Sequence, residues 1–161
     1  MIVILMGVTG AGKTTVGRLL VQELGWDFVD ADEFHSQANI EKMRRGIALT
    51  DADREPWLDS IREAMLKWLA DHKNVVLACS ALKRAYRECL QISLEVKIVY
   101  LRGSYNLIFS RLRDRHEHFA TTTLLASQFA NLEEPIDVVT IDAASSPGEI
   151  SANIRRALKL T

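Results

Sequence analysis

The sequence predicts an α/β protein with three layers, in which a five-stranded parallel sheet carries helices on both faces. Short apolar runs of strand length alternate with longer stretches whose apolar residues recur at helical spacing, as in successive βαβ units. No internal repeat and no Ser- or Gly-rich linker divides the 161 residues. We therefore expect a single domain over residues 1–161.

Five apolar runs predict the strands of this sheet. The first run contains no polar residue and is expected to be buried on both faces. Because ligands of such sheets bind at the carboxyl ends of the strands, the polar residues that follow each run are the candidates for chemistry. The predicted strands are residues 2–6, 26–30, 75–79, 96–101 and 138–141.

Amphipathic stretches between these runs predict the helices. Gly25 stops the first helix, and either Thr50 or Asp51 is expected to cap the long helix that follows. The last helix opens with a capping box at Ser146, and Pro147 occupies its first helical position. The helical patterns lie at residues 16–24, 39–46, 57–69, 82–90, 105–115 and 150–158.

A glycine-rich segment between the first strand and the first helix fits the phosphate-binding pattern G-x-x-x-x-G-K-S/T. Its glycines let backbone N–H groups turn toward phosphate oxygens, and the helix N-terminus adds partial positive charge. We expect Lys13 to reach the β- and γ-phosphates and the Thr14 hydroxyl to coordinate Mg²⁺. The segment predicts a P-loop NTPase fold that binds a nucleoside triphosphate. The predicted nucleotide-binding residues are Gly7, Val8, Thr9, Gly10, Ala11, Gly12, Lys13, Thr14 and Thr15.

Composition and charge exclude several classes of protein. A net charge of -1 argues against a nucleic-acid binder that relies on a basic surface, and no apolar run reaches the roughly 20 residues of a membrane span. The chain starts directly in the first strand, which leaves no room for a cleavable signal. Cys79 and Cys89 lack metal or redox spacing and are expected to be reduced thiols. We expect a cytoplasmic protein.

An acidic cluster follows the second predicted strand. If Asp30 ends that strand, Asp30 and Asp32 both lie where a γ-phosphate projects. Asp30 is then the candidate for holding Mg²⁺ through its water shell, and Asp32 for accepting the proton of an attacking hydroxyl. The alternative is that both are loop carboxylates and helix caps. His35 fits a substrate hydrogen bond and a structural hydrogen bond equally well.

Three cations are candidates for binding an anionic substrate. Arg54 precedes the long helix, and its guanidinium matches a carboxylate or phosphate in bidentate fashion, although pairing with an acidic neighbour is the alternative. Lys83 and Arg87 follow the third strand one helical turn apart, with a solvated basic face as the alternative. No acidic residue ends this strand, so metal binding falls on Thr14 and Asp30.

The region after the fourth strand predicts a short lid at residues 112–123. Arg111 and Arg115 lie one turn apart and are the candidates for clamping the transferring phosphate, as catalytic residues beside Lys13 and Asp32. Gln128, beyond the lid, is a candidate hydrogen-bonding partner for a polyol. The sequence His116-Glu117-His118 does not predict zinc, because residues two apart on a helix do not face each other.

Taken together, these residues resemble the gluconokinase family over most of the chain. The resemblance implies a fold like that of shikimate and adenylate kinases, and a transferase of carbohydrate metabolism that phosphorylates D-gluconate at its 6-hydroxyl with ATP and Mg²⁺. It also implies a homodimer. The matching segments are residues 7–14, Asp30-x-Asp32-x-x-His35, Asn39-Ile40-x-Lys42-Met43, Asp51-x-Asp53-Arg54-x-Pro56-Trp57-Leu58, Cys79-Ser80-Ala81-Leu82-Lys83-x-x-Tyr86-Arg87, His118-Phe119 and Leu125-x-Ser127-Gln128-Phe129.

The chain departs from this family pattern at a few positions. Ser36 stands where the family usually has proline, and Ala31 stands where it has glycine between the two aspartates. In the lid, His116 and Glu117 replace the usual Lys-Gly pair, a change that affects lid closure or phosphate affinity rather than reaction type.

Gluconate carries a carboxylate at one end and a primary hydroxyl at the other. A site for gluconate therefore needs cations far from the phosphate, which Lys83, Arg87 or Arg54 can supply, and a carboxylate beside the reacting hydroxyl, which Asp32 can supply. The alternatives are another P-loop kinase, acting on shikimate or a nucleoside monophosphate, and a nucleotide-binding regulator without catalysis. A switch GTPase is disfavoured because no Asn-Lys-x-Asp motif is present.

Overall fold

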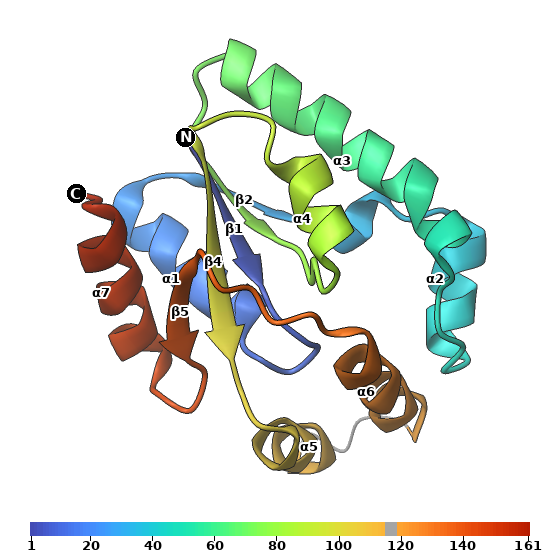
Figure 1. The fold of residues 1–161 in the computed structure, drawn as a ribbon. Helices are drawn as coiled ribbons and strands as arrows, with labels where there is room; N and C mark the ends of the chain where they lie inside the picture. The colour runs from blue at the N-terminus through green and yellow to red at the C-terminus, as the bar shows by residue number, and fades with distance from the viewer. Residues whose placement is uncertain (115–118) are drawn as a thin grey trace.

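The computed structural model describes residues 1–114 and 119–161 of the chain. Five parallel strands form one sheet in the order β2-β3-β1-β4-β5, with β1 in the centre, so the predicted fold class is confirmed (Figure 1). Ile2 of β1 pairs with Val75 of β3 on one side and with Val96 of β4 on the other. The strands are β1 Ile2–Met6, β2 Asp27–Asp30, β3 Val75–Ala78, β4 Val96–Arg102 and β5 Val139–Asp142.

Helices cover both faces of the sheet and gather at its carboxyl edge, where α2, α5 and α6 lie (Figure 1). One face packs against α1 and α7, and the opposite face packs against α3 and α4. The helical elements are α1 Lys13–Leu24, the 3₁₀ turn η1 Ala31–Phe34, α2 Gln37–Arg44, α3 Asp51–Ala70, α4 Arg84–Leu90, α5 Tyr105–Asp114, α6 Phe119–Asn131 and α7 Pro147–Leu158.

The strand β1 is completely buried, as its uninterrupted apolar sequence predicts. Its residues alternate between two hydrophobic cores, Val3 and Leu5 facing α1 and α7 while Ile2, Ile4 and Met6 face α3 and α4. This alternation ties both helical layers to the strand that leads into the P-loop. The P-loop therefore emerges from the central strand, which is packed between the two hydrophobic cores.

The contact between α1 and the sheet depends on a glycine. A Cβ atom at Gly17 would lie 2.5 Å from the Phe28 ring of β2, which is closer than carbon atoms approach. The glycine therefore lets α1 lie close against the sheet. Gly25 ends α1 in the left-handed conformation, and its N–H donates to Val21 O at 2.8 Å, as its position in the sequence predicts.

Most element ends agree with the sequence to within two residues, whereas η1 and α6 were not among the predicted helices. Some of the differences have clear local causes. The strand β2 starts at Asp27 rather than at residue 26, because the Trp26 N–H donates to Val21 O and so belongs to the end of α1. Of the two candidate caps of the long helix, Thr50 is the one used, and Asp53 completes a capping box. The capping box at Ser146 is also confirmed.

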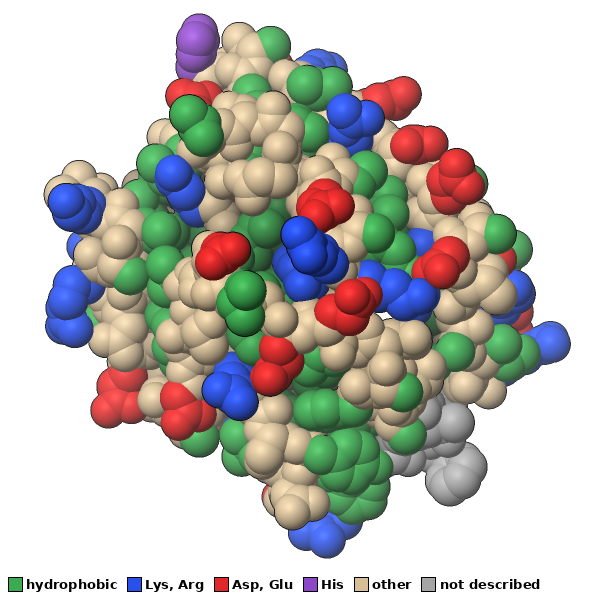
Figure 2. Space-filling model, in the orientation of Figure 1, with side chains coloured by type: hydrophobic (Ala, Val, Ile, Leu, Met, Phe, Trp, Pro, Cys, Tyr) green, Lys and Arg blue, Asp and Glu red, His purple; other side chains and the backbone are tan. Residues whose placement is uncertain are grey.

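The surface of the molecule carries charges of both signs. On the face shown in Figure 2, acidic and basic side chains are interspersed rather than gathered in one basic patch. Within the described part of the chain, no helix combines the length and apolar character that crossing a membrane requires. Arg115 and the lid residues 116–118 lie outside the described residues.

Candidate active site

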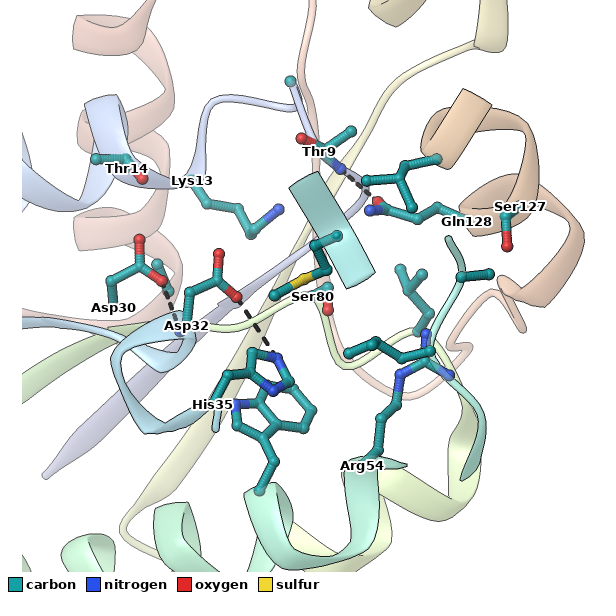
Figure 3. Close-up of a pocket in the computed structure, with 18 of the residues that line it drawn as sticks. Thr9, Lys13, Thr14, Asp30, Asp32, His35, Arg54, Ser80, Ser127 and Gln128 are labelled. Carbon is teal, nitrogen blue, oxygen red and sulfur yellow. Dashed lines mark hydrogen bonds and ion pairs between the residues drawn. The ribbon is translucent and has the colours of Figure 1, made fainter. Parts of the chain in front are cut away.

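A cavity of about 400 Å³ opens at the carboxyl edge of the sheet (Figure 3). Its walls come from the P-loop, the turn after β2, the first turns of α3, the end of β3 and helix α6. This volume lies in the range of small-molecule sites. The polar residues lining it are Thr9, Lys13, Thr14, Thr15, Asp30, Asp32, His35, Arg54, Ser80, Ser127 and Gln128.

The P-loop has the backbone conformation that an anion cradle needs. Gly7, Gly10 and Gly12 all have positive φ, at 151°, 80° and 103°. A Cβ atom at Gly7 would lie 2.9 Å from the backbone oxygen of Leu101 on β4, so a larger residue there displaces the loop. Gly12 precedes the first turn of α1, whose N–H groups are available to phosphate oxygens because Gly12 has no side chain to cap them.

Lys13 is folded onto its own loop. Its Nζ donates to the carbonyl oxygens of Gly7 at 2.8 Å and Val8 at 2.9 Å. Burial lowers the pKa of Lys13, and the nearby carboxylates of Asp32 and Asp30 oppose that shift. The ammonium group thus has two neutral acceptors that phosphate oxygens can replace.

The two predicted carboxylates reach the same cavity as the P-loop (Figure 3). Asp30 is the last residue of β2, and its Oδ1 accepts from the Asp32 N–H at 2.9 Å, which caps η1. Desolvation by the cleft walls raises the pKa of Asp32, whose side chain is still 74% exposed, and the charge of Asp30 raises it further, while Lys13 lowers it. A carboxylate with a raised pKa beside a phosphate cradle is suited to accept a proton.

Mg²⁺ has hard oxygen ligands available at this point. The hydroxyl of Thr14 and the carboxylate of Asp30 both line the cavity, and oxygen ligands of this kind are those Mg²⁺ prefers. Across residues 1–114 and 119–161, no cluster of three His, Cys, Asp or Glu side chains can hold a metal alone. These residues therefore fit an ion held mainly by phosphate oxygens and water. The segment His116-Glu117-His118 lies outside the described residues.

His35 lies against the wall of the cavity as a neutral ring. Its imidazole stacks on the Trp57 indole, with ring centroids 4.4 Å apart and planes 8° from parallel. Burial lowers the pKa of His35 to about 4, and the charge of Arg54 contributes to the shift. Its Nε2 lies 3.9 Å from Oδ1 of Asp32, and its Nδ1 lies 3.4 Å from Nδ2 of Asn39.

Arg54 is the predicted substrate cation that the structure places in the cavity lining. Its Nη1 donates to the Tyr86 hydroxyl at 3.1 Å, and that hydroxyl donates to Asp51. Lys83 lies just outside the cavity lining, because its Nζ pairs with Asp51 Oδ1 at 2.9 Å. Arg54, Lys83, Asp51 and Tyr86 therefore form one polar network at the rim of the cavity, and the Arg54 guanidinium is the part that faces inward.

Arg87 occupies a different place from the one predicted. Its side chain is buried, and its guanidinium donates to the backbone oxygens of Ala81 at 2.8 Å, Leu82 at 3.0 Å and Glu133 at 2.7 Å. All three acceptors are backbone, so the structure uses Arg87 to tie the segment after β3 to the segment after α6. It does not bring Arg87 to the cavity or to the side of Lys83.

The remaining predicted residues lie on either side of the P-loop. Gln128 of α6 lines the cavity, and its Oε1 accepts from the Thr9 N–H at 2.7 Å (Figure 3). Arg111 of α5 lies outside the cavity lining, where its Nη2 donates to Ala143 O at 2.5 Å and its Nη1 lies 3.5 Å from Gly10 O. Arg111 thus connects the back of the P-loop to the loop after β5, and its predicted clamping role remains a prediction.

Several residues of the site were not predicted from the sequence. Trp57 was expected only in the hydrophobic core, yet it also forms the platform for His35. Asn39 bridges His35 and the backbone of α3, and the available signal was its position four residues after His35. Ser80 and Ser127 also line the cavity, and the available signal was that both lie in segments that match the gluconokinase family.

Comparison with known proteins identifies similar sequences and a similar structure. A family model described as shikimate kinase matches residues 9–159 of this chain. The gluconokinase of Arabidopsis thaliana is 47% identical over 82% of this chain and 77% of its own length. The probable gluconokinase of Mus musculus is 40% identical over 98% of this chain and 97% of its own length. The crystal structure of a gluconokinase from Sinorhizobium meliloti 1021 is 38% identical, superimposes with a TM-score of 0.86, and covers 98% of this chain and 90% of that one.

Proposed function

Because the chain belongs to the gluconokinase family and carries the shikimate kinase-like domain, we propose that it transfers the γ-phosphoryl group of ATP to the 6-hydroxyl of D-gluconate. The products are 6-phospho-D-gluconate and ADP. One observation carries the proposal: the Asp32 carboxylate and the P-loop line the same cavity. That juxtaposition brings a proton acceptor next to the place where a γ-phosphate projects.

The transfer asks for three roles, and residues of the cavity can fill each of them. The acceptor hydroxyl gives its proton to Asp32 as its oxygen forms a bond to the γ-phosphorus, and the bond from that phosphorus to the bridging oxygen of ADP breaks. Lys13 exchanges its two carbonyl acceptors for phosphate oxygens and stabilises the charge that develops on them. When bound, Mg²⁺ neutralises phosphate charge, and Thr14 and Asp30 supply oxygen ligands for it.

At the other end of the substrate, we assign the carboxylate of gluconate to Arg54. Its guanidinium faces the cavity, whereas Lys83 is paired with Asp51 and Arg87 is buried among carbonyl oxygens. The Tyr86 hydroxyl accepts a hydrogen bond from Arg54 Nη1 and so fixes the orientation of the guanidinium group. Gln128 lies beside the P-loop instead, and because its Oε1 accepts from the Thr9 N–H, its amide N–H groups remain as donors to the substrate.

Assay of ADP release with a panel of acceptors tests the proposal. D-gluconate should support turnover, whereas D-glucitol, an open-chain polyol without the carboxylate, should show a much higher KM. Turnover with shikimate or with a nucleoside monophosphate, but not with gluconate, would instead indicate another kinase of this fold. Phosphorus NMR of the product checks that the phosphate is on O6. No turnover with gluconate would contradict the proposal, and ATP binding without any turnover would indicate a regulator.

We further propose a cytoplasmic, Mg²⁺-dependent homodimer. Two free cysteines, Cys79 and Cys89, suit a reducing compartment, and the oxygen ligands of Thr14 and Asp30 suit Mg²⁺. The dimer rests on the family resemblance. Light scattering of the purified protein measures the oligomeric state, and a mass of one chain would contradict the dimer.

Addition of excess EDTA should abolish turnover, and recovery of turnover when Mg²⁺ is added back checks the metal.

A further inference from the structure

The side-chain nitrogen of Asn39 faces two hydrogen-bond acceptors at once. Its Nδ2 donates to the backbone oxygen of Asp53 at 2.9 Å, and the same atom lies 3.4 Å from Nδ1 of His35. A carbonyl oxygen can only accept, so the group facing it must be the NH₂ of the amide. Asn39 is 7% exposed, which leaves the amide no solvent-facing alternative. One hydrogen of the NH₂ group therefore serves Asp53, and the other points to His35.

The His35 ring is also fixed in its plane. It stacks on Trp57, whose Nε1 donates to Ala31 O at 2.7 Å, and its own side chain is 4% exposed. A neutral imidazole carries one hydrogen on its two nitrogens. Because Nδ1 faces a donor, that hydrogen belongs on Nε2. Nε2 in turn faces Oδ1 of Asp32.

We propose that Asn39 and His35 are positioning residues for Asp32: Asn39 holds His35 as the Nε2–H tautomer, and His35 presents that N–H to Oδ1 of the carboxylate. The other oxygen of Asp32 is then left for the acceptor hydroxyl. The present separation of 3.9 Å is longer than a hydrogen bond, and such contacts in ligand-free enzymes shorten when the substrate complex forms. Only the role of Asp32 as the base rests on the proposed function.

The tautomer can be measured in the free protein by long-range ¹H–¹⁵N NMR of the histidine rings. At neutral pH we expect His35 to have a protonated Nε2 and a bare Nδ1, and the spectrum of His35→Gln identifies its signals. Asn39→Leu, or the smaller Asn39→Ser, should give a mixture of tautomers. A protonated Nδ1 in the wild type, or an unchanged tautomer without Asn39, overturns the proposal. The wild-type measurement needs no variant and no substrate.

Kinetics of His35 variants supply the second readout. The amide nitrogen of His35→Gln reaches the place of Nε2, whereas that of His35→Asn reaches the place of Nδ1. We expect the Gln variant to keep most of kcat, the Asn and Leu variants to lose roughly tenfold to 100-fold, and KM for ATP to stay unchanged. The exposed His72 provides the control His72→Gln, with unchanged kcat. Equal losses of kcat in His35→Gln and His35→Asn, or full activity in His35→Leu, overturn the proposal. A wild type inactive on gluconate contradicts the proposed function but leaves the tautomer result standing.

Discussion

The two halves of the cavity are built in different ways. The phosphate half comes from one continuous segment, residues 7–15, and uses backbone N–H groups held by glycines. The acceptor half uses side chains from separate elements, among them Asp32 of η1, Arg54 of α3 and Gln128 of α6. The first half can bind any triphosphate, whereas the second half needs particular side chains. Specificity for the acceptor therefore depends on tertiary contacts that hold those side chains in place.

The largest expected effect belongs to Lys13, the charged side chain of the phosphate half. Lys13→Met removes the charge that stabilises the transferring phosphoryl group, so we expect kcat to fall by roughly 10³-fold. Steady-state assays of ADP release measure the loss, and circular dichroism checks that the variant folds. If kcat stayed within tenfold of the wild type, the phosphate half would not work through Lys13.

Mutation of the two arginines predicted to bind substrate should affect different properties, substrate binding for Arg54 and stability for Arg87. Arg54→Met removes charged hydrogen bonds to the substrate and should raise KM for gluconate about tenfold to 100-fold with little change in thermal stability. Arg87→Met leaves three backbone oxygens without donors and should lower the free energy of unfolding by roughly 2–4 kcal/mol. Titration with urea and a gluconate saturation curve measure both quantities. The reverse pattern would contradict the assignment of Arg54.

Glycine substitutions test how far the phosphate half depends on backbone alone. Gly7→Ala places a Cβ against Leu101 O at a positive φ, and we expect ATP affinity to fall about tenfold and stability to fall by about 1–3 kcal/mol. Gly148→Ala is the matched control, because nothing lies within 4 Å of a Cβ there and it sits in α7. It should raise stability by about 0.4–1 kcal/mol. Calorimetry measures the ATP affinity of both variants, and thermal melts measure their stability. Equal ATP affinity and equal stability in the two variants would contradict the account.

The smallest expected effect is a pH dependence of stability in the acceptor half. The pKa of His35 falls from 6.5 to about 4 in the folded protein, so below pH 6.5 the unfolded chain binds a proton that the folded chain does not. The free energy of unfolding therefore falls as the pH drops from 6.5 to 4. Melting at pH 7 and pH 5 should show a larger drop for the wild type than for His35→Gln. Equal drops would mean that His35 is not held neutral.

Local sequence patterns were enough to predict the phosphate half. The P-loop, the strand before it and the helix after it are contiguous, and their conformation follows from glycine positions and apolar periodicity. Asp30 and Asp32 could be placed because they follow a strand directly, and the carboxyl ends of parallel strands meet at one edge.

The acceptor half was predicted less well, because its partners are distant in sequence. Lys83 and Arg87 were expected to share a helix face, but α4 begins at Arg84, so Lys83 is the extended residue before it and does not follow helical spacing. Arg87 finds its partner in Glu133, 46 residues away, and no local pattern indicates that contact. The stacking of His35 on Trp57 likewise depends on how α3 packs against η1.

Replacement of Asp32 by Asn tests the central claim, that this carboxylate accepts the proton of an acceptor bound beside the P-loop. The account predicts that Asp32→Asn lowers kcat with gluconate by roughly 10²-fold or more, while calorimetry finds ATP affinity close to that of the wild type. Asp71→Asn, at an exposed carboxylate beyond the end of α3, is the control and should change neither quantity. Unchanged kcat in Asp32→Asn would contradict the account.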